Sequence, residues 1–265
     1  MAYASALSAT ETRPAIPAIR KIALSDLGAA LLAGVADFRA APTQLVFLCI
    51  IYPLVGFVAA RAAFGYEILP VLFPLLSGFA LVGPVAAVGV YELSRRREQG
   101  QDVAWFHAFG VLRSPSLPSI AILACLFFAI FVAWLAAAAA IHQLTLGGPP
   151  PASLGSFMHD VFMTPGGWAL IVAGNAVGFA FAALVLTLSV VSLPMLVDRN
   201  VGPVVALQTS VRAVAANPAA MAAWGLVVVA CLLAGCALLF VGLAVVMPVL
   251  GHATWHLYRK VVVAG

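Results

Sequence analysis

Long stretches without a charged residue constrain this chain more than any other feature of its sequence. Asp, Glu, Lys and Arg are absent from residues 40–60, 68–91, 114–159, 161–197 and 213–258. A helix needs about 20 apolar residues to cross the ~30 Å hydrocarbon core of a bilayer. Only 8% of the 265 residues are charged and 64% are hydrophobic, whereas soluble domains carry about 25% charged residues. The composition favours a membrane protein over a soluble enzyme, a disordered chain or a nucleic-acid binder.

The lengths of these stretches predict six membrane spans. The third stretch holds one span and then a loop, because Gln143–Pro165 is rich in Gly, Pro, Ser and Thr. The fifth stretch would extend about 69 Å as one helix, so it must fold back, and Gly242 with nearby Gly235 and Pro248 offers the turn. The predicted spans are Leu45–Phe64, Leu69–Tyr91, Leu117–Ile141, Trp168–Val197, Pro218–Phe240 and Leu243–Val262.

The basic residues predict the orientation of these spans. With the N-terminus in the cytoplasm, twelve of the 13 Lys and Arg residues lie on the cytoplasmic side, and only Arg61 lies outside. A five-span alternative would put Arg259 and Lys260 outside. Because cytoplasmic loops carry the excess of basic residues, the sequence favours six spans with both termini in the cytoplasm.

The chain is expected to form an all-α bundle of three transmembrane hairpins. A short amphipathic stretch with an Arg and then a Pro precedes the first, third and fifth spans, which predicts an interfacial helix before each hairpin. We expect a disordered cytoplasmic tail over residues 1–20, followed by a single membrane domain over residues 21–263. The similar span ends suggest three internal repeats, which are residues 26–97, 100–199 and 200–262.

The pair His252 and His256 is the best candidate for binding a cofactor. The two side chains are four residues apart, so they share one face of the last predicted span, a spacing that can bind a metal or face a haem. The alternative is a belt of His, Trp and Tyr rings at the headgroup level. No third ligand is evident, so no cofactor is predicted, and haem or metal binding stays open.

Glu92 and the arginines at span ends are candidate membrane-boundary anchors. An acid at a span end can pair with an Arg three or four residues later, or can serve in proton relay or substrate binding. The arginine run after the second span suits anionic lipid as well as topology. The candidate anchors are Arg39, Glu92, Arg95, Arg96, Arg97, Arg113, Arg212, Trp255, Tyr258 and Arg259.

Two further motifs concern helix packing. Gly174, Asn175 and Gly178 form a small-residue motif in the fourth span, where glycines allow close approach and an amide can bond across the contact. Ser77-Gly78 and Gly83-Pro84 interrupt the second span. Such interruptions line binding sites in transporters, or are simple kinks whose free carbonyls are bound by neighbours.

Three polar or aromatic motifs at span ends resemble the DUF2189 family of bacterial integral membrane proteins. They are Gly34-Val-Ala-Asp-Phe-Arg-Ala-Ala-Pro42, Gly78 to Pro84 leading to Gly89-Val-Tyr-Glu-Leu-Ser-Arg-Arg96, and Gly251-His-Ala-Thr-Trp-His-Leu-Tyr-Arg259. The similarity extends over most of residues 20–263. It implies a location in the bacterial cytoplasmic (inner) membrane and no established activity. Some members carry a cytochrome c oxidase label, which implies a respiratory link, although the chain lacks the set of histidine ligands that an oxidase core needs.

The sequence leaves three functions open. We find no phosphate loop, nucleophile elbow, zinc-protease motif or dinucleotide fingerprint, which weighs against an enzyme. The first interpretation is a scaffold, assembly or accessory component of a membrane complex, for which the family label suggests a respiratory complex. The second is a transporter or channel for a neutral or lipid-like solute, and the third is haem or metal handling through His252 and His256. The expected partners are membrane lipid and another membrane protein complex or a second copy, without nucleic acid.

Overall fold

The computed structural model describes residues 16–43, 47, 69–148, 151, 153–238 and 240–263. The predicted span Leu45–Phe64 therefore lies outside the described residues, apart from Phe47. In the described part every element is helical except one isolated bridge between Ile19 and Val262, which confirms the all-α prediction. The elements are α1 (Leu24–Ala40), α3 (Leu69–Ala86), α4 (Val88–Glu98), the 3-10 helix η2 (Trp105–Arg113), α5 (Leu117–Thr145), α6 (Leu154–Met163), α7 (Pro165–Ser189), α8 (Ser192–Asp198), α9 (Pro203–Ala216), α10 (Pro218–Ala237) and α11 (Leu243–Val261).

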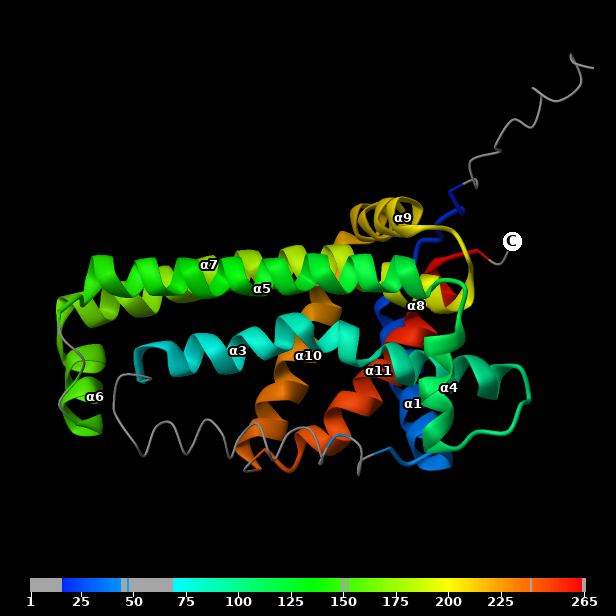
Figure 1. Ribbon diagram of the computed structural model, residues 1–265, viewed down its shortest axis with the longest axis horizontal. Helices are drawn as coiled ribbons and strands as arrows, with labels where there is room; N and C mark the ends of the chain where they lie inside the picture. The colour runs from blue at the N-terminus through cyan, green and yellow to red at the C-terminus, as the bar shows by residue number, and fades with distance from the viewer. Residues whose placement is uncertain are drawn as a thin grey trace, which may run out of the picture.

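Four helical segments of the described chain are long and apolar enough to cross a membrane. They coincide with the second to fifth predicted spans, and they are Leu72–Glu98, Leu117–Thr145, Pro165–Asp198 and Pro218–Ala237. The first joins α3 to α4 and the third joins α7 to α8. Figure 1 shows α5 and α7 side by side along the longest axis of the molecule, and α3 packs on α5.

The last predicted span corresponds to α11, which pairs with α10 as a hairpin. Gly235 and Gly242 form the tight turn as expected, since a Cβ on Gly242 would lie 2.8 Å from the Cα of Gly235. Helix α11 is not among the four segments, and its second half carries His, Trp, Tyr, Arg and Lys side chains. In Figure 1, α10 and α11 run at a steep angle to α3, α5 and α7.

Helices occur where interfacial helices were expected, and one further helix was not foreseen. Elements α1, η2 and α9 precede the first, third and fifth predicted spans. Helix α6 lies in the segment Gln143–Pro165, which we expected to be a loop. Its start is fixed by Ser153, whose Oγ accepts a hydrogen bond from the backbone N–H of Ser156 at 3.0 Å. A Ser in this capping position stabilises a helix start and offsets the turn-rich composition.

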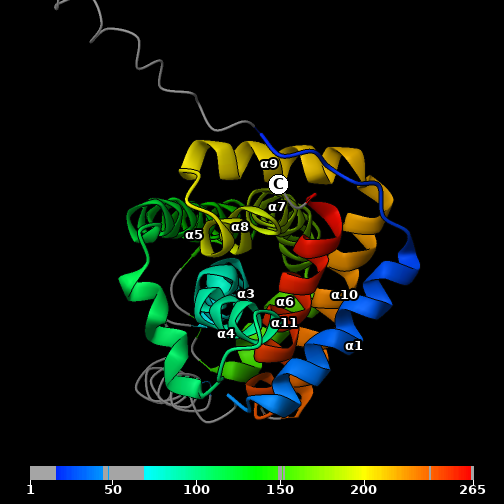
Figure 2. The ribbon, with the colours of Figure 1, turned by 90° about the vertical axis from the view of Figure 1, so that its right-hand side faces the viewer.

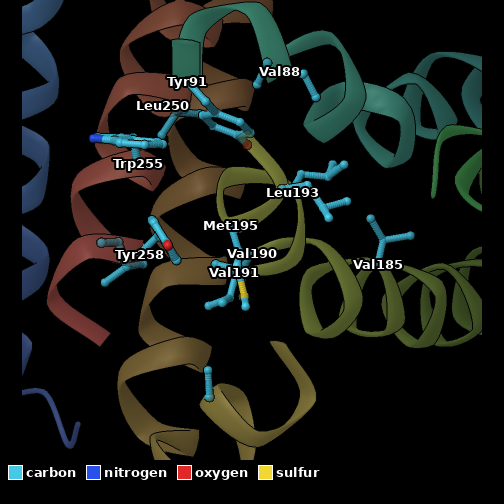
Figure 3. Packing of buried hydrophobic residues seen from close by; sticks show 14 of the residues in the cluster. Val88, Tyr91, Val185, Val190, Val191, Leu193, Met195, Leu250, Trp255 and Tyr258 are labelled. Atoms are coloured by element: carbon cyan, nitrogen blue, oxygen red, sulfur yellow. The ribbon is translucent and has the colours of Figure 1, made fainter. Parts of the chain in front are cut away.

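Many of the fully buried side chains lie at the end of the molecule opposite α6, where α4, α8 and α11 meet (Figure 1). Figure 3 shows Tyr91, Leu193, Met195, Trp255 and Tyr258 from these three helices packed together. The rings of Trp255 and Tyr258 are fully buried. Figure 2 looks at this end directly and shows α11 between α1 and α4.

The N-terminal segment is tied to the C-terminal end of α11. The backbone N–H of Arg20 donates to the carbonyl of Val261 at 2.8 Å, and that of Val263 donates to the carbonyl of Ala18 at 3.1 Å. Asn217 accepts from the N–H of Ile22 and donates to the carbonyl of Arg20. These contacts hold residues 18–22 against the C-terminal end of α11 and the start of α10.

A candidate polar site between three helices

Two glycines bring α11 into close contact with α1 on one side and α4 on the other. A Cβ on Gly34 of α1 would lie 2.6 Å from the backbone nitrogen of Ala253. A Cβ on Gly251 of α11 would lie 3.0 Å from the side chain of Val90 on α4. Because a Cβ on Gly34 would clash with backbone and one on Gly251 would press on Val90, the glycines at these two positions bring polar side chains of three helices within hydrogen-bond reach.

Asp37 lies at the centre of the polar side chains that meet there. Its Oδ2 accepts from the hydroxyl of Ser94 at 2.6 Å and lies 2.8 Å from Nε2 of His256. Its Oδ1 accepts from a guanidinium nitrogen of Arg97 at 2.8 Å. The Nδ1 of His252 lies 2.7 Å from the hydroxyl oxygen of Ser94. We call these five residues the Asp37 cluster.

The hydrogen bonds define the tautomer of His252. Ser94 has one hydroxyl proton, which it donates to the Asp37 carboxylate, because an ionised carboxylate can only accept. The Ser94 oxygen is then the acceptor for His252, so Nδ1 carries the proton and Nε2 presents a lone pair. This Nε2 is buried and has no hydrogen-bond partner among the described residues. The cluster therefore contains one unsatisfied acceptor.

The arrangement stabilises a charged Asp37. Burial raises the pKa of the Asp37 carboxyl, but hydrogen bonds from His256 and Ser94 outweigh it, so the pKa lies below its ordinary value. The order Asp37–Ser94–His252 differs from a catalytic triad, in which the histidine takes the serine proton. Here Ser94 gives its proton to the carboxylate, so the geometry does not activate it as a nucleophile.

A second set of polar contacts joins the end of α11 to α4 and α8. Glu98 accepts from the indole N–H of Trp255 at 3.0 Å and pairs with Arg259 at 2.8 Å. Asp198 accepts from the hydroxyl of Tyr258 at 2.6 Å and from Arg259 at 3.2 Å. Trp255 and Tyr258, expected as boundary anchors among lipid headgroups, are instead buried inside the protein, because their polar atoms find these carboxylates.

The histidines proposed as cofactor ligands each use one ring nitrogen within the Asp37 cluster. Nδ1 of His252 contacts Ser94, and Nε2 of His256 contacts Asp37. Within the described residues no group of three or more His, Cys, Asp or Glu side chains is placed to hold a metal ion. The nitrogen that remains open to a ligand in a buried position is Nε2 of His252.

The charged residues proposed as anchors fall into two groups. Glu92 is held by Arg95 through two hydrogen bonds of 2.7 and 2.8 Å, the structural pairing expected from their spacing, and Arg97 and Arg259 also bind carboxylates. The other anchors make no ion pair with any described residue, and these are Arg39, Arg96, Arg113 and Arg212.

The packing motif of α7 makes one of its expected contacts. Gly178 lies against Trp134 of α5, since a Cβ there would be 3.1 Å from the ring. A Cβ on Gly174 would meet no described atom within 4 Å. Asn175 is exposed, and its amide donates to the carbonyl of Ile171 on its own helix at 2.7 Å. Among the described residues, Gly174 and Asn175 thus make no close interhelical contact.

At the interruption in α3, the backbone carbonyl of Pro74 is bound by a side chain of the neighbouring helix α5. The carbonyl of Pro74 accepts from the indole N–H of Trp134 at 2.8 Å and from the hydroxyl of Ser77 at 3.2 Å. A Cβ on Gly78 would lie 2.5 Å from the ring of Phe131. These contacts fit the kink interpretation of the Ser77-Gly78 motif, because the polar groups are bound within the protein.

Sequence reasoning missed the residue at the centre of the cluster. Asp37 lies on α1, whose apolar stretch is too short for a membrane span. No local motif links Asp37 to Ser94 or His252. One signal was present: Asp37, Ser94 and His252 each fall in one of the three motifs that carried the family resemblance. Glu98 and Asp198 had no such signal, because their partners are 60 or more residues away in the sequence.

Comparison with known proteins identifies one family. Residues 72–198 match the family model described as "Predicted integral membrane protein (DUF2189)". No curated protein and no solved structure matches the chain. The matched residues contain α4 with Ser94 and Arg97, whereas the motifs at residues 34–42 and 251–259 lie outside them. Residues 72–198 therefore resemble the DUF2189 family of predicted integral membrane proteins, the same family that the sequence motifs indicated.

Proposed function

We propose that this protein is a structural component of a membrane complex in the bacterial cytoplasmic membrane, as a scaffold, assembly factor or accessory subunit. The observation that carries the proposal is the exposed amide of Asn175 near the middle of α7. A polar side chain inside a membrane is costly and pairs with another polar group when one is within reach. The carbonyl oxygen of this amide makes no hydrogen bond to the described chain and is free to bind a partner helix.

The surroundings of Asn175 support a helix–helix contact. Val172 and Phe179 lie about one turn before and after it and are both exposed, and Gly174 leaves open space beside it. Small residues next to an amide are typical of interfaces between membrane helices. The Asp37 cluster supports a structural role, because its polar groups bind one another.

The test compares Asn175→Leu with Val172→Leu. Both variants alter exposed side chains of one helix, but only the first removes an amide. After extraction in a mild detergent, we expect the wild-type protein and Val172→Leu to run as a particle larger than one chain, and Asn175→Leu to shift to the mass of the monomer. A wild-type particle of one chain, or identical masses for all three proteins, would contradict the proposal.

We further propose six spans with both termini in the cytoplasm. The pairing of Ile19 with Val262 supports an even number of crossings, because paired residues lie on one side of the membrane. The excess of basic residues supports the cytoplasmic side. A reporter fused after Lys260 should be cytoplasmic and one inserted at Gly147 external; an external reporter after Lys260 would refute the proposal.

A second candidate function, haem or metal binding, is favoured by the bare Nε2 of His252 alone. The visible spectrum and metal content of the purified protein test it. Binding through this atom predicts a bound group that is lost in His252→Ala and kept in His159→Ala, a variant of an exposed histidine on α6. Absence of any bound metal or chromophore in the wild-type protein would remove this candidate.

A further inference from the structure

A cavity of about 480 Å³ lies between α4, η2, the turn that precedes α5, and the end of α8. Its wall includes Glu92, Arg95 and Arg96 from α4, Arg113 from the end of η2, Ser114, and Arg199 beyond α8. Three of the four candidate spans end at this junction, at Glu98, Leu117 and Asp198. Because the ends of spans lie near the polar surface of a bilayer, the cavity is placed at the level of lipid headgroups.

The charges around this cavity leave an excess of positive charge. Two carboxylates of the wall are already neutralised: Glu92 by Arg95 and Asp198 by Arg199. Arg96 uses its Nε to donate to the carbonyl of Asp102, and neither Arg96 nor Arg113 makes an ion pair with a described residue. Two guanidinium groups with free N–H donors therefore line the cavity.

An apolar cavity adjoins the basic one. It has a volume of about 530 Å³, shares Arg96, Gly110 and Arg113 with the first, and is lined by Phe106, Phe109 and Leu112 of η2. These three side chains are more than half exposed. Exposed aromatic rings on a short helix at a membrane boundary are typical of the interfacial region. The two cavities together present phosphate-binding donors beside a surface suited to acyl chains.

We propose that these adjoining cavities bind one anionic phospholipid. Its phosphate occupies the basic cavity, where Arg96 and Arg113 donate to the phosphate oxygens and the Ser114 hydroxyl adds a neutral donor. Arginine suits this role because its planar fork binds two phosphate oxygens at once. The acyl chains lie along Phe106, Phe109 and Leu112. Basic pockets between membrane helices bind headgroups in this way.

The test measures lipid binding to the delipidated protein by native mass spectrometry. The wild-type protein is titrated with phosphatidylglycerol, with phosphatidylcholine and with glycerol 3-phosphate. We expect one phosphatidylglycerol to bind at least tenfold more tightly than either of the others. The double variant Arg96→Gln/Arg113→Gln should lose roughly 30-fold in affinity for phosphatidylglycerol, given the typical contribution of two basic groups.

Arg212→Gln is the matched control. Arg212 is an exposed arginine on α9 that makes no ion pair to a described residue and does not line the cavity, so its loss should leave affinity within twofold. Ser114→Asp provides an independent variant: an aspartate can still accept from the N–H of Ser116, as Ser114 does, and it should abolish binding by repelling phosphate.

Three results would overturn the proposal. Equal affinity for phosphatidylglycerol and phosphatidylcholine would show that the arginines do not select charge. An equal loss of affinity for phosphatidylglycerol in Arg212→Gln and in the double variant would show that binding depends on the net charge of the protein and not on the cavity. Tight binding of glycerol 3-phosphate, equal to that of the lipid, would assign the cavity to a soluble phosphate ester.

Discussion

Replacing Asp37 by Ala should destabilise the protein more than the loss of any other single acidic side chain in its described part. Asp37 accepts hydrogen bonds from Ser94, His256 and Arg97, which lie on α4 and α11. Its removal leaves these donors without their acceptor. The three helices would then keep their apolar contacts but lose the polar group that joins them.

The size of the effect follows from the burial of each donor. Ser94 is 1% exposed, so its unsatisfied hydroxyl costs about 1–3 kcal/mol. The side chains of His256 and Arg97 are 25% and 40% exposed, so water replaces much of what they lose, and each adds about 0.5–1 kcal/mol. The expected loss in the free energy of unfolding is about 2–5 kcal/mol.

Equilibrium unfolding in mixed micelles measures this loss. The matched control is Asp102→Ala, which removes an exposed carboxylate that makes no side-chain ion pair with a described residue. We expect the control to change the free energy of unfolding by less than about 0.5 kcal/mol. If Asp37→Ala and Asp102→Ala unfold alike, the Asp37 cluster does not hold α1, α4 and α11 together and the reasoning is refuted.

Three further predictions concern the same helices. Gly34→Ala should cost about 1–3 kcal/mol in the same unfolding assay, because the added methyl meets backbone of α11, whereas Gly28→Ala on the open face of α1 should be neutral or stabilising; equal effects would contradict the close contact. The pKa of Asp37 is lowered in the folded protein, so the cluster should stabilise the fold fully above the ordinary carboxyl pKa of about 4 and lose that contribution as the pH falls through the lowered pKa. Asp37→Asn should remove this pH dependence of the free energy of unfolding. If the variant keeps the pH dependence of the wild-type protein, Asp37 is not its source. Glu98→Gln should lower the free energy of unfolding by less than about 1 kcal/mol, because its partner Arg259 is partly exposed. A loss above about 3 kcal/mol would mean that Glu98 stabilises the fold as much as Asp37 does.

The helices of this protein could be predicted from sequence because their signal is local. Runs of apolar residues longer than a bilayer thickness mark α5, α7 and α10 without knowledge of any tertiary contact. The turn at Gly242 followed from length alone, because one helix of 46 residues exceeds the bilayer. Helix α6 was not predicted because the Gly and Pro residues of this segment favour a loop, and the stabilising effect of the Ser153 cap was not considered.

The polar site could not be predicted in the same way because its signal is not local. Asp37 lies 57 residues from Ser94 and 219 residues from His256, and neither spacing forms a motif. Trp255 and Tyr258 looked like residues of a membrane interface because the sequence does not show that Glu98 and Asp198 are placed to accept their hydrogen bonds. In the fold, several of the charged residues that mark the ends of predicted spans form contacts between helices.

The pairing of Ile19 with Val262, which places both residues on one side of the membrane, is tested most directly by a disulfide between Ile19→Cys and Val262→Cys. These residues face each other as an antiparallel pair without mutual hydrogen bonds, in which Cα atoms lie about 4.5 Å apart, within the range that a disulfide spans. In membranes from cells expressing the double variant without its native cysteines, a mild oxidant should form the bond within one chain. Two free thiols reactive from opposite sides of sealed vesicles would instead show an odd number of crossings and contradict the account.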